Sequence, residues 1–257
     1  MSYRRYVAIG DSCAEGLDDP YPDGRGFRGF ADLTATRLAE VEPDLHYANL
    51  AVRGRRLDQI LAEQVPVATR LRPDLVTLFG GGNDVLQGRI TGLAANLDAI
   101  AGAFAGIART TVLFTLPDLA RRLPGMSWLR PRVDVLNELI IATAARHGTL
   151  LVDVREDPWA EDIRLYGADR LHLGELGHHR VAGHLLTALG VSPGDWLAPL
   201  PSAVREPVWR AVVRQWNWVR HHVTPAVHGA VRNKLIGRQP GDGFVAKRPE
   251  LARLIDR

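Results

Sequence analysis

Short apolar runs alternate with amphipathic stretches through the first 190 residues of the chain. Strands that alternate with helices predict a parallel sheet with helices on both faces. Right-handed crossovers leave few other topologies, so we expect a three-layer α/β/α sandwich around a five-stranded parallel sheet. The strand candidates are residues 6–9, 45–52, 75–79, 111–116 and 150–154, and the helix candidates are residues 27–40, 57–71, 90–108, 133–147 and 175–189.

The pattern changes after residue 189. Prolines and glycines at residues 192–201 interrupt the alternation, and residues 204–235 then have helical spacing with several tryptophans. We expect a principal domain at residues 1–192 and a basic, tryptophan-rich helical appendage at residues 193–257. Its apolar stripe consists of Trp209, Val212, Val213, Trp216, Val219 and Val223, with Arg210, Arg214 and Arg220 on other faces.

The composition narrows the class of protein. With 257 residues and 46% apolar composition the chain can bury a sizeable core without metal or disulfide staples. It carries a single cysteine, Cys13, and no secretory signal pattern, so we expect a cytoplasmic location. No apolar stretch reaches the roughly 18 residues of a membrane span.

The net charge of +3 is unevenly distributed. Residues 203–257 hold 11 Lys+Arg and 4 Asp+Glu, a net of +7, and the preceding residues hold 21 and 25, a net of −4. The basic tail could contact an anionic membrane or cap the active site, or it could be a helix that docks on the parent domain or on a second subunit. No element that reads nucleic-acid bases is visible, and both a monomer and a homodimer remain open.

Candidate catalytic residues follow the predicted strands. Ser12 lies on a Gly-Asp-Ser turn after the first strand, where its hydroxyl could reach a substrate carbonyl. Gly54 follows the second strand and Asn83 the third, and an asparagine amide can donate to a developing oxyanion. Asp169 precedes His172 by three residues, a spacing that lets the carboxylate accept the Nδ1 proton of the ring.

Together these blocks resemble the SGNH, or GDSL-type, family of esterases and lipases. The matching residues are Gly10-Asp11-Ser12 with Gly16, then Gly54, then Gly82-Asn83-Asp84, and finally Asp169 with His172. The resemblance covers about residues 3–190 and implies a flavodoxin-like sandwich. It also implies that Ser12 is the nucleophile, that His172 is the base oriented by Asp169, and that the Ser12 N–H, the Gly54 N–H and the Asn83 side chain form the oxyanion hole. No metal or organic cofactor is implied.

Several alternatives remain at this stage. Cys13 could replace Ser12 as nucleophile, and His172 could join His178, His179 and His184 in a metal cluster, although no supporting Cys or carboxylate spacing is present. The same acyl-serine intermediate would serve an acyltransferase or a carbohydrate O-deacetylase. An alternative from a different class is a non-catalytic binding module that acts through its basic tail. The candidate catalytic residues argue against it, because such a module has no need for an oriented nucleophile and base. The expected substrate is a small-molecule ester.

Overall fold

The computed structural model describes residues 2–123, 125–202, 207–224, 228, 232–233 and 235–254. Its centre is a six-stranded sheet in the order β5-β4-β3-β1-β2-β6. Strands β1 to β5 run parallel, in the topology expected from the sequence, and β6 is antiparallel to β2. The strands are β1 (Arg5–Gly10), β2 (His46–Asn49), β3 (Leu75–Phe79), β4 (Thr110–Phe114), β5 (Leu150–Val152) and β6 (Arg248–Arg253).

The predicted count of five strands is wrong by one. Strand β6 comes from the segment that we expected to be a helical appendage, and it pairs with the open edge of β2. Its sequence Arg-Pro-Glu-Leu-Ala-Arg contains no apolar run, because an edge strand can remain partly exposed. Pro249 is tolerated there, since it lies on an edge strand at the point where the register with β2 shifts.

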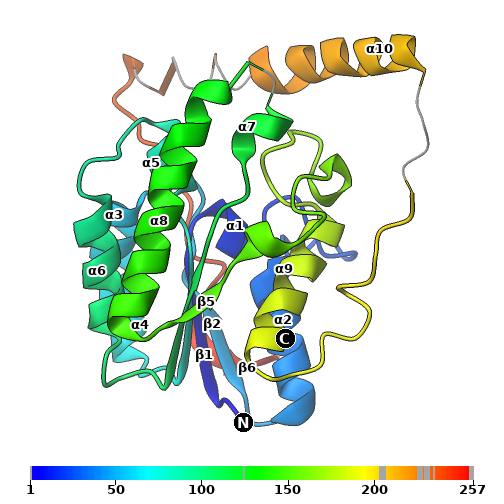
Figure 1. The fold of residues 1–257 in the computed structure, drawn as a ribbon. Coiled ribbons are helices and arrows are strands. Elements are labelled where there is room, and N and C mark those ends of the chain that lie inside the picture. Colours follow the sequence, from blue (N-terminus) through cyan, green and yellow to red (C-terminus); the bar gives the residue numbers. More distant parts are fainter. Residues whose placement is uncertain are drawn as a thin grey trace.

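Helices cover both faces of the sheet (Figure 1). On one face α2 packs against α9, and on the other α6 packs against α8. The helices are α1 (Ser12–Glu15), α2 (Gly29–Val41), α3 (Leu57–Gln59), α4 (Val65–Arg70), α5 (Gly82–Leu86), α6 (Leu93–Ala103), α7 (Leu119–Arg122), α8 (Arg130–His147), α9 (Glu175–Ala188) and α10 (Val208–Trp218). One π-helical segment joins α3 to α4 (Ile60–Gln64), and another continues α10 (Val219–Val223).

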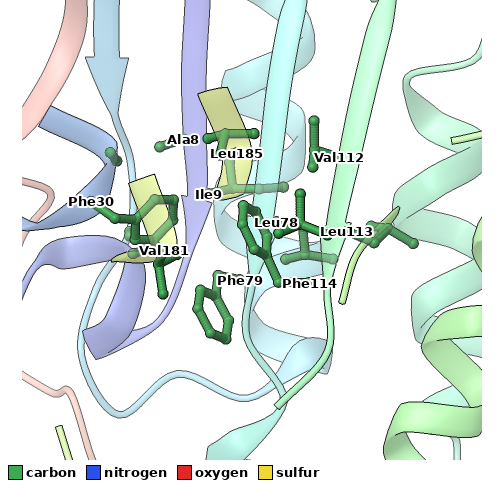
Figure 2. Close-up of a cluster of buried hydrophobic side chains, with 14 of the residues drawn as sticks. Ala8, Ile9, Phe30, Leu78, Phe79, Val112, Leu113, Phe114, Val181 and Leu185 are labelled. Carbon is green, nitrogen blue, oxygen red and sulfur yellow. The ribbon is translucent and has the colours of Figure 1, made fainter. Parts of the chain in front are cut away.

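The core under α2 and α9 is aromatic. Phe79 at the end of β3 and Phe114 at the end of β4 stack with ring centroids 5.0 Å apart, and Phe30 of α2 lies 5.2 Å from Phe114. Figure 2 shows these rings beside Val181 and Leu185 of α9, against the side chains of the central strands. Such aromatic contacts stabilise the packing at the carboxyl end of the sheet, where the loops of the candidate site begin.

The C-terminal part of the chain lies against the domain in two places. Helix α10 crosses the end of the molecule at which the parallel strands finish, and the last described residues return to β2 (Figure 1). The expected helix over residues 204–235 is observed at 208–223, while residues 203–206, 225–227, 229–231 and 234 lie outside the described residues. Within the described part of the chain, no helix combines the length and apolar character needed to cross a bilayer.

Candidate active site

Ser12 lies at the carboxyl end of β1, on a turn that requires glycine. Gly10 has φ +146°, and a Cβ there would lie 2.1 Å from the Phe79 carbonyl oxygen of the neighbouring strand. Asp11 then caps α1 by accepting a hydrogen bond from the Cys13 N–H at 3.1 Å. Ser12 is thereby held at the start of α1 with 8% of its surface exposed.

Asn83 lies in the same region, after β3, the strand beside β1 in the sheet. It lies in α5, which begins directly after β3 and behind Gly81, whose φ is +102°. The Asn83 Nδ2 donates to Asp11 Oδ2 and to the Arg55 carbonyl oxygen, each at 3.2 Å. These bonds tie together the loops that follow β1, β2 and β3.

His172 and Asp169 lie on the loop before α9, far along the chain from Ser12. The His172 Nδ1 and Asp169 Oδ2 are 2.5 Å apart. Asp169 Oδ1 in turn accepts from the backbone N–H groups of Leu171 at 2.9 Å and His172 at 3.0 Å. The carboxylate is therefore fixed by three donors and leaves the His172 Nε2 available for other chemistry.

Three of the predicted residues share one cavity. Ser12, Asn83 and His172 line a space of about 60 Å³, together with the apolar side chains of Phe79 and Leu116. The cavity lies at the carboxyl ends of β1 and β3, where the strand order reverses and α/β sheets characteristically bind ligands.

Gly54 lies beside this group but does not line the cavity. Its φ is +79°, and a Cβ there would lie 2.7 Å from the Gly241 nitrogen. The neighbouring carbonyl of Arg55 accepts from Asn83, so the loop of Gly54 is coupled to the cavity through that bond. The sequence did not indicate that Gly241, from the C-terminal segment (residues 238–254), would pack on this loop.

Other contacts of the C-terminal segment hold the same loop. The Arg55 Nη1 donates to Asp242 Oδ1 at 3.1 Å, and the Arg53 guanidinium lies 4.5 Å from the centre of the Phe244 ring. Lys247 lies beside the start of α2, where its Nζ donates to the Phe27 carbonyl oxygen at 3.0 Å and pairs with Asp32 Oδ1 at 2.8 Å.

The charges around the cavity favour a serine over a cysteine nucleophile. Burial raises the pKa of the Cys13 thiol, and the nearby Asp11 carboxyl raises it further. Because the thiolate is the reactive form, this thiol is a poor nucleophile near neutral pH.

Burial also raises the pKa of Asp11 to about 7. Burial alone would lower the pKa of His172, but the hydrogen bond and charge of Asp169 outweigh it, and the net shift is upward.

One further carboxylate joins the pair. Asp18, with φ +66°, lies close enough to Asp169 and His172 that ligand-type atoms of all three fall within 4.8 Å of one another. Burial raises the pKa of Asp18, and the charge of Asp169 raises it further. This is the group that could hold a metal ion among the described residues, but the 2.5 Å contact between His172 Nδ1 and Asp169 Oδ2 is that of a hydrogen bond rather than of two metal ligands.

The other histidines of α9 do not converge on this group. His178 is buried, accepts from the Phe30 N–H at 3.1 Å and contacts the Leu17 carbonyl oxygen at 3.0 Å. Burial lowers its pKa to about 4, so it is a neutral core residue rather than a surface one. His184 instead lies 2.7 Å from Asp157.

A model of the family described as "GDSL-like Lipase/Acylhydrolase family" matches residues 8–180, about two thirds of the chain. The chain belongs to this family. The match contains the blocks that carry Ser12, Gly54, Asn83, Asp169 and His172. Membership supports an acyl-ester hydrolase as the class of protein.

Solved structures share the fold of this GDSL-like acylhydrolase. LAE5, an alpha/beta hydrolase enzyme from the metagenome of Lake Arreo, superposes with a TM-score of 0.62 and 24% identity over 74% of this chain and 96% of that one. Axe2, an acetylxylan esterase from Geobacillus stearothermophilus, gives 0.62 and 19% over 75% and 96%. The lipase/acylhydrolase from Enterococcus faecalis gives 0.59 and 21% over 74% and 98%. At these identities the likeness concerns the fold.

A curated relative matches in sequence over 159 residues. Cytochrome P450 monooxygenase 212 of Postia placenta is 28% identical to the acylhydrolase over 58% of this chain and 23% of that protein. The chain thus spans less than a quarter of that relative's length, and the monooxygenase name describes the larger protein.

Proposed function

We propose that the chain hydrolyses carboxylic esters through an acyl-Ser12 intermediate. The observation that carries the proposal is that Ser12, Asn83 and His172 line one cavity, while His172 Nδ1 bonds to Asp169 Oδ2 at 2.5 Å. This is the arrangement of groups that a serine nucleophile needs, namely a base with an orienting carboxylate and a donor for the oxyanion.

In the first half of the reaction His172 Nε2 takes the Ser12 proton as Oγ attacks the acyl carbon. The tetrahedral intermediate collapses, the bond to the alcohol oxygen breaks, and His172 returns the proton to the leaving alcohol. Water then attacks the acyl-Ser12 ester with the same base, and the acid and free Ser12 are released. Asp169 keeps the ring in the tautomer that leaves Nε2 able to accept a proton.

The oxyanion would be held by the Ser12 N–H, the Gly54 N–H and the Asn83 amide. Both Nδ2 bonds of Asn83, to Asp11 and to the Arg55 carbonyl, are 3.2 Å long, at the weak end of the normal range. An oxyanion is a stronger acceptor than either partner, so one Nδ2 hydrogen can turn to it as negative charge develops.

The size of the cavity favours short acyl groups. An adjoining apolar cavity, also about 60 Å³, shares the walls formed by Cys13, Phe79, Leu116 and Leu171. Spaces of this size suit an acetyl or similarly small group better than a long chain. For that reason removal of acetyl groups from a carbohydrate is the second candidate for the same site, and transfer of the acyl group to an alcohol would use the same intermediate.

The test is hydrolysis of p-nitrophenyl esters from acetate to palmitate by wild type, Ser12→Ala and, as matched control, Cys13→Ala. We expect the rate to be highest for short chains and Ser12→Ala to lose at least about a thousandfold in kcat. Cys13→Ala should keep most of the activity. An inactive wild type across the whole series, or equal activity of wild type and Ser12→Ala, would contradict the proposal.

A further inference from the structure

One face of helix α10 contacts the loop that carries Asp169 and His172. Trp218 is 7% exposed, and its Nε1 donates to the Asp169 carbonyl oxygen at 3.1 Å. The Arg170 guanidinium lies 4.5 Å from the centre of the Trp218 ring and donates to Gln215 Oε1 at 2.8 Å. The inner face of the helix is therefore anchored next to His172.

The opposite face carries large apolar side chains that are exposed. Trp209 is 63% exposed, Val213 51% and Trp216 72%. They are spaced by four and three residues, which places them on one stripe of the helix. Trp218 is nine residues from Trp209, half a turn away at 100° per residue. We call Trp209, Val213 and Trp216 the outer stripe.

An exposed stripe of this kind points to something that covers it. Large apolar side chains exposed in a contiguous row mark contact surfaces on most soluble proteins. In Figure 1, α10 lies across the end of the molecule that also holds α7, beyond the carboxyl ends of the parallel strands. Whatever covers the outer stripe therefore lies at the same end of the molecule as Ser12 and His172.

The charge of this part of the chain indicates what kind of partner contacts the outer stripe. From Pro207 to Arg238 there are six Lys+Arg and no Asp or Glu. Arg210, Arg220 and Arg232 are exposed. A second copy of the chain would place two strongly basic segments face to face, which argues against a dimer through the outer stripe. A helix with tryptophans on one face and basic residues beside them fits a membrane interface that contains anionic lipid.

We propose that the outer stripe of α10 docks on an anionic lipid surface. The tryptophan rings would enter the headgroup region, and the basic residues would pair with lipid phosphates. Because the inner face of the helix holds the Asp169 loop, docking places the active-site end of the protein at the membrane. The surface does not depend on the chemistry proposed for Ser12.

The test is sedimentation with vesicles of phosphatidylcholine alone and of equimolar phosphatidylcholine and phosphatidylglycerol. We expect the wild type to bind the anionic vesicles at least about tenfold more tightly, and high salt to weaken this binding. The double variant Trp209→Ala/Trp216→Ala should bind at least about tenfold more weakly. Ile107→Ala is the matched control, because Ile107 is 43% exposed and precedes β4 at the opposite end of the sheet.

Controls separate this proposal from the esterase proposal. The double variant should keep the wild-type melting temperature and, without vesicles, the wild-type rate on p-nitrophenyl acetate. If the protein binds vesicles but hydrolyses no ester, the membrane-docking proposal stands and only the ester-hydrolase proposal is contradicted. Equal binding to both vesicle types, or no loss in the double variant, would overturn the surface. So would a dimer in analytical ultracentrifugation that the double substitution dissociates.

Discussion

Replacing Asp169 by Asn tests the proposal that this carboxylate orients His172. One oxygen of Asp169 accepts from the Leu171 and His172 backbone N–H groups at 2.9 and 3.0 Å, and the other binds His172 Nδ1 at 2.5 Å. Asn has a single oxygen, and the two backbone donors will keep it. Its amide group then donates to Nδ1, which forces the ring proton onto Nε2, the atom that we propose accepts the Ser12 proton. We expect kcat to fall by about 10⁴.

The pH profile provides a second measurement on the same variant. In the proposed mechanism His172 must be neutral to act as base, and Asp169 raises its pKa. Wild-type kcat/KM should therefore fall with decreasing pH through a value above the ordinary pKa of about 6.5. In Asp169→Asn burial remains and the negative charge is gone, so this acidic limb moves to lower pH.

The difference in folding stability between the wild type and Asp169→Asn should depend on pH. The pKa of His172 is raised by folding, so its contribution is present below about pH 6.5 and is lost as pH rises through the folded value. The pKa of Asp169 is lowered in spite of burial, because of the His172 hydrogen bond and charge, so its contribution is lost as pH falls below about 4. Asp169→Asn should therefore cost most stability between about pH 4 and 6.5.

The assay is p-nitrophenyl acetate hydrolysis from acid to alkaline pH, with Asp169→Ala as the matched control. Alanine leaves Nδ1 without its partner but allows either tautomer, so its loss in kcat should be smaller than that of Asn. If Asp169→Asn kept more than about a tenth of wild-type kcat, or lost less than Asp169→Ala, the tautomer argument would be refuted.

Two further substitutions test the proposed oxyanion hole. Asn83→Ala should lower kcat by about 10² to 10³ with KM little changed, measured on p-nitrophenyl acetate, and a change confined to KM would contradict the assigned role. Gly241→Ala would place a Cβ 2.3 Å from the Arg53 carbonyl oxygen, whereas Gly237→Ala, also at positive φ, meets nothing within 4 Å. Displacement of the Gly54 loop should lower kcat of Gly241→Ala about tenfold to a hundredfold relative to Gly237→Ala, and equal kcat values would show that the C-terminal segment does not position Gly54.

The five parallel strands could be predicted because short, largely buried segments alternate with amphipathic stretches along this part of the chain. The run at residues 75–79 coincides with β3. Strand β6 offered no such pattern, since three of its six side chains are charged and none is buried. Its conformation comes from pairing with the edge of β2. Local sequence carries little information about a strand of that kind.

For the candidate site, too, some features could be predicted from the sequence and others could not. Ser12, Asn83 and His172 could be placed near one another because they follow strands or precede α9 at one end of a parallel sheet. The contact of Trp218 with Asp169 and the packing of Gly241 on Gly54 join segments far apart in the chain, with no motif at either end. His178 shows the same limit, because only the packed structure reveals that it is buried.

The order of synthesis gives β6 a consequence for how the protein matures. Strand β2 and the Gly54 loop leave the ribosome early, but the segment that pairs with them follows about 190 residues later, a delay of roughly 10 to 40 s at ordinary translation rates. During that interval the edge of β2 has no partner and can template the pairing of another chain. We expect nascent chains halted before residue 248 to be bound by chaperones or lost to aggregation, and the candidate active site to be completed only after β6 has been released.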